Sequence, residues 1–276
     1  MKTILVLTDF SKKAENAALY ALKLAEKTHA NILLFHLIGQ MQAVNVPEAG
    51  SWLVEDYEIF KNESLRGLLY LKDTLETNHD PAAFKPTIHW FNEIGPDLAC
   101  TIAAIVQSEQ IDLVVMGARG NDVLSHLFYG SDTSGVLGHA GCPVLFVPPG
   151  CSCDNIKTIV FANDFKEDYT QAVHFVTSLA KACNSHIILT HFGPYDNEAF
   201  HSLDLIKSAH QYAHVSSRLL PLENFGEQLT HFATAANADV VVTIHHHGLT
   251  LDKLLGGSKS KKMLNQNEVP LLVLPA

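Results

Sequence analysis

Three short clusters of glycines and polar residues in the first half of the chain have the composition of a phosphate-binding site. Thr8-Asp9-Phe10-Ser11 follows one apolar run, and Gly117-Ala118-Arg119-Gly120 follows another. Further along, Gly130-Ser131-Asp132-Thr133 precedes a predicted helix. Glycines let backbone amides approach an oxyanion closely, and free N–H groups at a helix N-terminus favour phosphate. Because Ser131 and Thr133 add hydroxyl donors, the three clusters together predict a phosphate cradle.

Other chemistry-bearing motifs are missing or weak in this sequence. It contains neither GxxxxGK[ST] nor GxGxxG, which disfavours a P-loop NTPase and a dinucleotide-binding Rossmann enzyme. The run His245-His246-His247 and the pair Cys151 and Cys153 could contribute metal ligands, but two thiolates alone do not complete a zinc site. We interpret both groups as loop residues and predict no metal site. No general base or nucleophile stands out, so we assign no catalytic residue and expect at most slow catalytic turnover.

The elements that would position the clusters alternate along the chain. Short apolar runs predict strands and amphipathic stretches predict helices. In the first half the predicted strands are 3–8, 31–37, 87–91, 112–116 and 143–147, and the predicted helices are 12–29, 51–78, 97–109 and 131–140. In the second half the predicted strands are 156–162, 186–191, 214–220, 239–244 and 270–274. Alternation of this kind, with strands that are apolar throughout, predicts an open parallel sheet covered on both faces.

The second half repeats the first. Ile4-Leu5-Val6-Leu7-Thr8-Asp9-Phe10 resembles Ile159-Val160-Phe161-Ala162-Asn163-Asp164-Phe165, at an offset of 155 residues. Asp112-Leu113-Val114-Val115 resembles Asp239-Val240-Val241-Val242 at an offset of 127, so one deletion of roughly 28 residues separates the copies. A repeat of this length predicts two copies of one structural unit.

The repeat predicts an α/β protein of two tandem, open, doubly wound domains with five-stranded parallel sheets. We place these domains at 1–149 and 155–276, joined by the turn-rich connector 148–153. Each domain ends in an apolar edge strand that needs cover. We therefore expect the two last strands to pair, so that the halves pack as a pseudo-dimer; a further homodimer is compatible with the sequence but is not fixed by it.

The spacing Gly117-x2-Gly120-x9-Gly130-Ser131 resembles the glycine signature of the universal stress protein family. The flanking Val114-Val115-Met116 and Pro143-Val144-Leu145-Phe146-Val147 are also similar to that family, as is the opening Leu7-Thr8-Asp9-Phe10-Ser11. The resemblance covers essentially the whole chain as two copies, and it implies domains of the adenine-nucleotide α-hydrolase-like type.

The family resemblance also implies an adenine-nucleotide ligand, ATP or AMP, in the first domain. Asp9 would lie by the adenine, His36 and Leu37 would offer backbone to the base, the glycines would line the ribose and phosphates, and Ser131 and Thr133 would bind phosphate oxygens. The full set of expected nucleotide-binding residues is Thr8, Asp9, Phe10, Ser11, His36, Leu37, Met116, Gly117, Arg119, Gly120, Gly130, Ser131, Asp132 and Thr133. The alternative is that Asp9 only caps the next helix and the glycines only turn the chain. We expect Gly117→Val or Gly130→Val to weaken ATP binding at least tenfold, about 1.4 kcal/mol, and the fold to survive if the change stays in the loop.

Asp132 departs from the family, which usually has an apolar residue at this position. Its carboxylate either weakens triphosphate binding, helps to hold Mg²⁺, or only complements the helix N-terminus.

The second copy has lost part of the glycine signature. Ile244 and His247 replace Gly117 and Gly120, although Asp164, Gly257, Ser258 and Lys259 could form a vestigial site. We therefore expect one nucleotide per chain, bound in the first half.

Composition limits the remaining classes of function. The net charge of -10 disfavours nucleic-acid binding, which needs clustered basic residues, and no apolar run is long enough to span a membrane. With five cysteines, an odd number, and no export signal at the start, the sequence predicts a soluble cytoplasmic protein. The leading hypothesis is a nucleotide-binding stress or signalling protein. The alternatives are a non-enzymatic dimerisation scaffold with vestigial pockets, and a protein that binds a metal or small molecule through its second half.

Overall fold

The computed structural model describes residues 1–39, 52–118, 131–163, 170–192, 212–220, 225–245 and 269–275. The first half contains β1 (Thr3–Leu7), α1 (Lys12–Thr28), β2 (Asn31–Gly39), α2 (Trp52–Asn78), β3 (Ile88–Gly95), α3 (Leu98–Ser108), β4 (Leu113–Gly117), α5 (Ser131–His139) and β5 (Val144–Val147). The second half contains β6 (Thr158–Asn163), α6 (Thr170–Cys183), β7 (His186–Phe192), β8 (Val215–Leu220), α8 (Phe225–Ala235), β9 (Val240–His245) and β10 (Leu271–Pro275).

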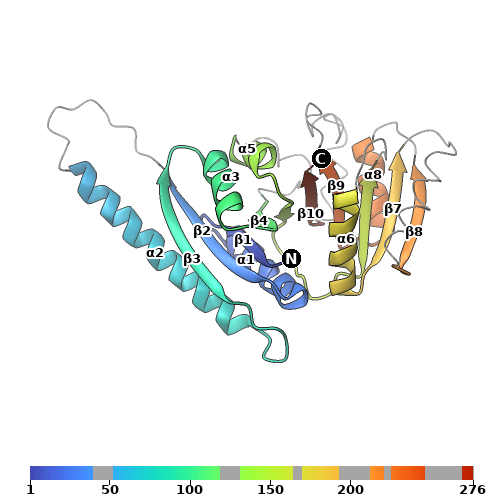
Figure 1. Ribbon diagram of the computed structural model, residues 1–276, viewed down its shortest axis with the longest axis horizontal. Helices are drawn as coiled ribbons and strands as arrows, with labels where there is room; N and C mark the ends of the chain where they lie inside the picture. Colours follow the sequence, from blue (N-terminus) through green and yellow to red (C-terminus); the bar gives the residue numbers. More distant parts are fainter. Residues whose placement is uncertain are drawn as a thin grey trace.

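The strands form one ten-stranded sheet in the order β3-β2-β1-β4-β5-β10-β9-β6-β7-β8 (Figure 1). Among the described strands, all pairings within each half are parallel, and only β5 and β10 run antiparallel, with Leu145 opposite Leu272. The α/β fold with five parallel strands in each half is confirmed, as is the pairing of the two last strands. The backbone groups along β5 and β10 thus hydrogen-bond to one another, so neither strand leaves an exposed edge.

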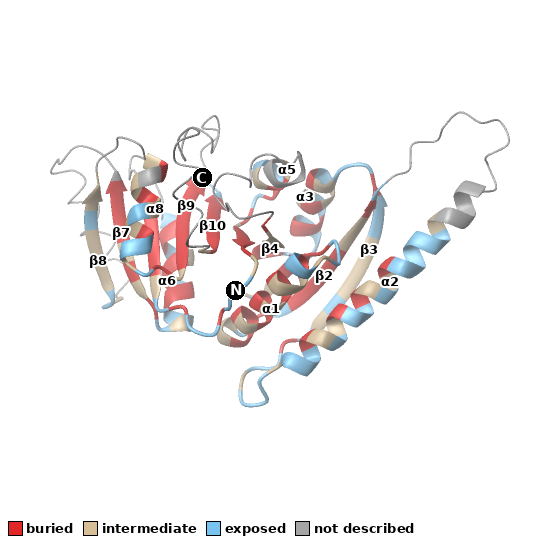
Figure 2. Ribbon diagram, turned by 180° about the vertical axis from the view of Figure 1, so that it is seen from behind, coloured by how far each residue is buried: buried red, intermediate tan, exposed pale blue. Residues whose placement is uncertain are grey.

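Two hydrophobic cores lie on opposite faces of the sheet (Figure 2). Alternate residues of each strand feed one core or the other: Ile4 and Val6 pack with α1, α2 and α6, whereas Leu5 and Leu7 pack with α3, α5 and α8. Both cores contain residues from both halves, such as Val147 and Leu272 in the first core. The halves are therefore joined by shared burial as well as by the strand pair.

Helix α1 shows why these segments adopt their structures. The Ser11 hydroxyl accepts a hydrogen bond from the Ala14 N–H at 3.2 Å, and Glu15 lies in the positively polarised first turn. The alanines Ala17, Ala18 and Ala21 are fully buried, which lets α1 pack closely on the sheet. The helix ends where His29 adopts a left-handed conformation, φ 55°.

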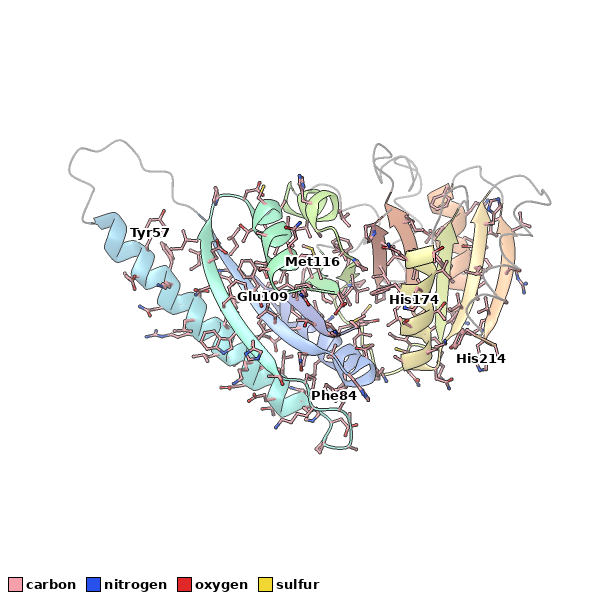
Figure 3. All side chains as sticks on the ribbon, viewed as in Figure 1. Tyr57, Phe84, Glu109, Met116, His174 and His214 are labelled. Carbon is pink, nitrogen blue, oxygen red and sulfur yellow. The ribbon has the colours of Figure 1, made fainter. Side chains whose placement is uncertain are left out.

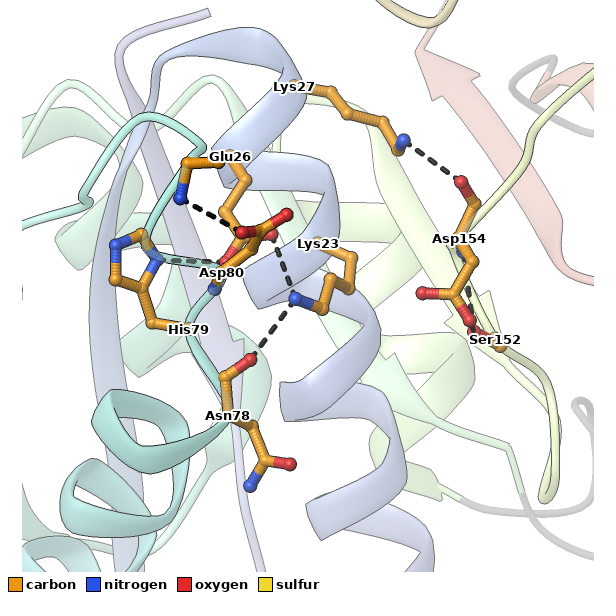
Figure 4. Close-up of polar contacts among 9 residues, drawn as sticks. Lys23, Glu26, Lys27, Asn78, His79, Asp80, Ser152 and Asp154 are labelled. Atoms are coloured by element: carbon orange, nitrogen blue, oxygen red, sulfur yellow. Dashed lines mark hydrogen bonds and ion pairs between the residues drawn. The ribbon is translucent and has the colours of Figure 1, made fainter.

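A polar network holds the end of α2 against α1 (Figure 4). One carboxylate oxygen of Glu26 accepts hydrogen bonds from His79 Nδ1 and from the Asp80 N–H, both at 2.9 Å, and the other lies 3.0 Å from Lys23 Nζ. Lys23 Nζ also donates to the Asn78 carbonyl in the last turn of α2. Burial pushes the pKa of Glu26 upward, but these hydrogen bonds and the Lys23 charge outweigh burial and leave the pKa below its usual value.

Candidate functional site

A cavity of about 400 Å³ opens beyond the carboxyl ends of β1, β2 and β4. In the strand order β3-β2-β1-β4-β5 the chain direction across the sheet reverses between β1 and β4, so the cavity lies at the topological switch point. Seven of the predicted nucleotide-binding residues line it: Thr8, Asp9, Ser11, His36, Leu37, Met116 and Gly117. Met116 is labelled near the end of β4 in Figure 3. The size falls within the range of small-molecule pockets, roughly 300–1,000 Å³.

The loop between β1 and α1 is held by hydrogen bonds within itself. Thr8 Oγ1 accepts from the Phe10 N–H and Asp9 Oδ1 accepts from the Ser11 N–H, each at 3.0 Å. Phe10 adopts a left-handed backbone with φ 61°, which is uncommon outside glycine and asparagine. Ser11, not Asp9, is the N-cap of α1. The Asp9 carboxylate closes the turn before the cap, and Asp9 lines the cavity, so a role for Asp9 in ligand binding stays a prediction.

His36 connects the end of β2 to this loop. Its Nδ1 lies 2.7 Å from the Thr8 carbonyl oxygen, which can only accept, so Nδ1 carries the proton. The Thr8 N–H in turn donates to the Phe35 carbonyl at 3.0 Å. The Phe10 ring lies against the imidazole with ring centroids 4.5 Å apart. The cavity wall at this corner is therefore held by contacts from two adjacent strands.

Gly117 is the last residue of β4, and it brings α1 against the cavity. A Cβ at this position would lie 2.9 Å from the Lys13 carbonyl oxygen and 3.2 Å from the Ala14 nitrogen. These are backbone atoms in the first turn of a packed helix, so they cannot move aside easily. Gly117 thus lies in a strand and not in a loop, so the condition under which Gly117→Val is expected to leave the fold intact is not met.

Several lining residues were missed in the sequence. They are Leu7, Lys13, Ala14, Phe35, Gly39, Gly95, Pro96, Leu98 and Ala118. Gly95 and Pro96 follow β3, and a turn signal after a predicted parallel strand could have placed them at the same edge of the sheet. Lys13 adds a positively charged side chain to the lining of the cavity, and Leu37, Leu98 and Met116 form an apolar part of its wall.

The remaining predicted site residues cannot be placed in the same way. Arg119, Gly120, Gly130, Asp164, Gly257, Ser258 and Lys259 lie outside the described residues. The backbone of Ser131, Asp132 and Thr133 forms the first turn of α5, as the sequence predicted for the start of this helix. Whether these residues contact a phosphate stays a prediction.

Metal and thiol chemistry finds little support in the described parts of the chain. Within them no three His, Cys, Asp or Glu side chains converge as metal ligands. His246 and His247 lie outside those parts. Cys153 is fully buried, and burial raises the pKa of its thiol well above the usual range, so the thiolate that a metal or an oxidant needs is disfavoured. Nor is any described helix both long and apolar enough to cross a membrane.

The comparisons with known proteins identify the family of the chain and agree with this fold. The sequence profile of the universal stress protein family matches residues 1–148, and the chain belongs to that family. A universal stress protein of Methanocaldococcus jannaschii is 27% identical over 151 residues, which cover 53% of this chain and 81% of that protein. A universal stress protein of Thermus aquaticus is 30% identical over 148 residues, covering 53% of this chain and 98% of the relative.

Similarity of fold extends over the whole chain. A crystal structure of a universal stress protein from Archaeoglobus fulgidus superposes with a TM-score of 0.70 and 16% identity, and the match covers 99% of this chain and 96% of that one. The second half therefore belongs to the same overall architecture as the first.

Proposed function

We propose that this universal stress protein binds an adenine nucleotide, ATP or AMP, in the cavity of its first half and acts in a stress or signalling response. The observation that carries the proposal is the convergence of Thr8, Asp9, His36 and Gly117 on one cavity at the topological switch point. Nucleotides bind at this location in open parallel sheets.

The residues that line the cavity suit both the base and the phosphate end of an adenine nucleotide. Leu37, Leu98 and Met116 offer apolar surface for a flat base, and the Asp9 carboxylate can accept from an exocyclic amine. Lys13 supplies the positive charge that phosphates need. The glycine-containing segment from Gly117 toward Ser131 would complete the phosphate cradle, with Mg²⁺ bound if Asp132 faces the phosphates.

The proposal includes one nucleotide per chain. Ile244, which replaces Gly117 in the second half, is 2% exposed, so its side chain fills space within the core at the end of β9. We assign the nucleotide site to a domain of residues 1–149 and a vestigial pocket to a domain of residues 155–276. Hydrolysis would be slow at most, since the described lining holds no evident pair of nucleophile and base.

The cavity offers a direct test at Gly39, the last residue of β2. A Cβ at this lining glycine would meet no atom of the described residues within 4 Å, so Gly39→Leu should extend into the cavity without a clash with them. We expect ATP and AMP affinity, measured by isothermal titration calorimetry, to fall at least tenfold, about 1.4 kcal/mol.

The matched control is Gly138→Leu in α5, where a Cβ also meets open space and which does not line the cavity. This variant should bind like the unmodified protein, and both variants should unfold at similar temperatures. If Gly39→Leu binds nucleotide as well as Gly138→Leu does, the cavity is not the site. If the unmodified protein binds no nucleotide, the scaffold alternative replaces the proposal.

A further inference from the structure

Helix α2 carries a second stripe of side chains on the side away from the sheet. Its inner side packs Ser64, Leu68, Leu71 and Leu75 into the core. On the outer side Ile59 is 54% exposed and Tyr70 is 66% exposed. Exposed large apolar residues on a long helix point to a contact surface when they lie on one face.

Ile59 and Tyr70 do lie on one face, together with two charged residues between them. The positions 59, 63, 66 and 70 follow the 4-3-4 spacing that places side chains on one stripe of a helix. Glu63 and Arg66 occupy the middle of this stripe, and both are exposed. Within the described parts of the chain neither forms an ion pair. We call Ile59, Glu63, Arg66 and Tyr70 the outer stripe of α2.

The outer stripe is complementary to itself when its direction is reversed. In an antiparallel pair centred between residues 64 and 65, Ile59 would face Tyr70 of the partner subunit. Glu63 would face Arg66 of the partner subunit, and by symmetry each contact would occur twice. A two-fold axis requires this kind of self-complementary patch.

The strand edges that could otherwise join two copies in the middle of the sheet are occupied. β5 and β10 already pair within one chain, so an additional copy must use another surface. The outer stripe lies at the end of the molecule, where α2 packs over β3, the terminal strand of the sheet (Figures 1 and 2). Phe60 and Leu69, each 40% exposed, lie about a quarter turn to either side of the stripe, outside its direct contacts.

We propose that two copies of this protein associate through antiparallel packing of their α2 helices along the outer stripe. The contact spans about three helical turns, roughly 18 Å. This is less than a standard protein–protein interface, so the dimer is weak and concentration-dependent.

The test is sedimentation velocity of the full chain across about a hundredfold range of concentration. The unmodified protein should shift from monomer to dimer. Glu63→Arg and Arg66→Glu should each weaken dimerisation at least tenfold, because each places like charges across the two-fold axis. An equimolar mixture of the two variants should dimerise again, since two basic side chains then face two acidic ones. The double variant Glu63→Arg/Arg66→Glu should recover for the same reason.

The control is the exchange Lys72→Glu/Glu76→Lys. This pair also lies on α2, with 3.5 Å between Lys72 Nζ and Glu76 Oε1, but it is off the outer stripe. The exchange keeps the ion pair and should leave dimerisation unchanged, and the helix content of all variants should stay the same. A protein that is monomeric throughout, a dimer indifferent to both single reversals, or a mixture that stays monomeric would each overturn the proposal.

Discussion

The two halves of this protein share a framework of strands but differ at the position where the first half builds its cavity. Asp112 Oδ2 accepts from the N–H groups of Lys2 and Thr3 at 2.5 and 3.0 Å, and Asp239 Oδ2 accepts from those of Lys157 and Thr158 at 2.7 and 2.8 Å. Left-handed residues also recur at equivalent places: His29 and Asn184 end the first helix of each half, and Gln110 and Asn237 precede the fourth strand. The order of the strands is the same in both halves.

The fourth strands of the two halves, β4 and β9, differ in sequence at their carboxyl ends. Gly117 admits the backbone of α1, whereas Ile244 buries a branched side chain at the same place in the repeat. Glu26 anchors α2, whereas the equivalent residue of the second half is the exposed Lys181. Both halves therefore keep the same sheet, although the residues that shape the cavity of the first half are replaced in the second.

Substitutions at Gly117 and Ile244, where the two halves differ, should have the largest effect on the free energy of unfolding. Ile244→Gly removes a buried side chain from β9 and should lower the free energy of unfolding by about 4 kcal/mol. Gly117→Ile forces a side chain against the backbone of Lys13 and should lower it by about 3 kcal/mol. Urea unfolding followed by circular dichroism measures both. If Gly117→Ile were neutral, the contact between β4 and α1 would not explain this glycine.

The Glu26 network should give the next largest effect, because Glu26 is buried whereas the equivalent residue of the second half, Lys181, is exposed. Glu26→Ala leaves Lys23 and His79 without their buried partner and should cost about 2 kcal/mol. Because the pKa of Glu26 is depressed in the folded state, its contribution is present at neutral pH and is lost as the pH falls through its folded pKa.

The difference in stability between Glu26→Ala and the unmodified protein should therefore shrink in acid. Lys181→Ala, the matched change in the second half, should alter stability by no more than about 0.5 kcal/mol. If Glu26→Ala and Lys181→Ala lowered the free energy of unfolding equally, the expected difference between the two halves would be contradicted.

The two equivalent aspartates of the shared framework, Asp112 and Asp239, should contribute equally to stability, and each should contribute less than Glu26. Asp112→Ala and Asp239→Ala each remove two hydrogen bonds to backbone N–H groups at the start of a strand. Each should lower the free energy of unfolding by about 1.5 kcal/mol. Thermal unfolding of both single variants tests this, and a marked difference between them would show that the repeated contacts are not equivalent.

The smallest expected difference concerns the unfolding of the two halves. Burial raises the pKa of Cys142, in the first half, to about 12 and that of Cys183, in the second, to about 11, so both thiols react slowly in the native state. Since both cores cross the β5–β10 pair, pulsed alkylation in urea should show one midpoint for both cysteines. Exposed Cys100 should react without denaturant and serves as the control. Two separated midpoints would mean that each half unfolds alone.

Much of the fold could be predicted because the strands are continuous apolar runs bounded by turn residues. The strand predicted at 31–37 is observed at Asn31–Gly39, and the helix predicted at 97–109 at Leu98–Ser108. The site could be predicted only in part. Asp9 follows one strand and His36 lies near the end of another, so both could be placed at one edge of the sheet, but the contact between Gly117 and Lys13 joins residues far apart in the chain. Local periodicity carries no information about such a contact.

A titration of the purified full chain with ATP, with stoichiometry measured by calorimetry, tests the central claim that only the first half holds a nucleotide site. Ligand that copurifies with the protein is first removed and identified by mass spectrometry. We predict one nucleotide per chain, bound at least tenfold more weakly in Gly39→Leu, whose added side chain extends into the first cavity. Two nucleotides per chain, or one whose affinity Gly39→Leu does not lower, would contradict the account.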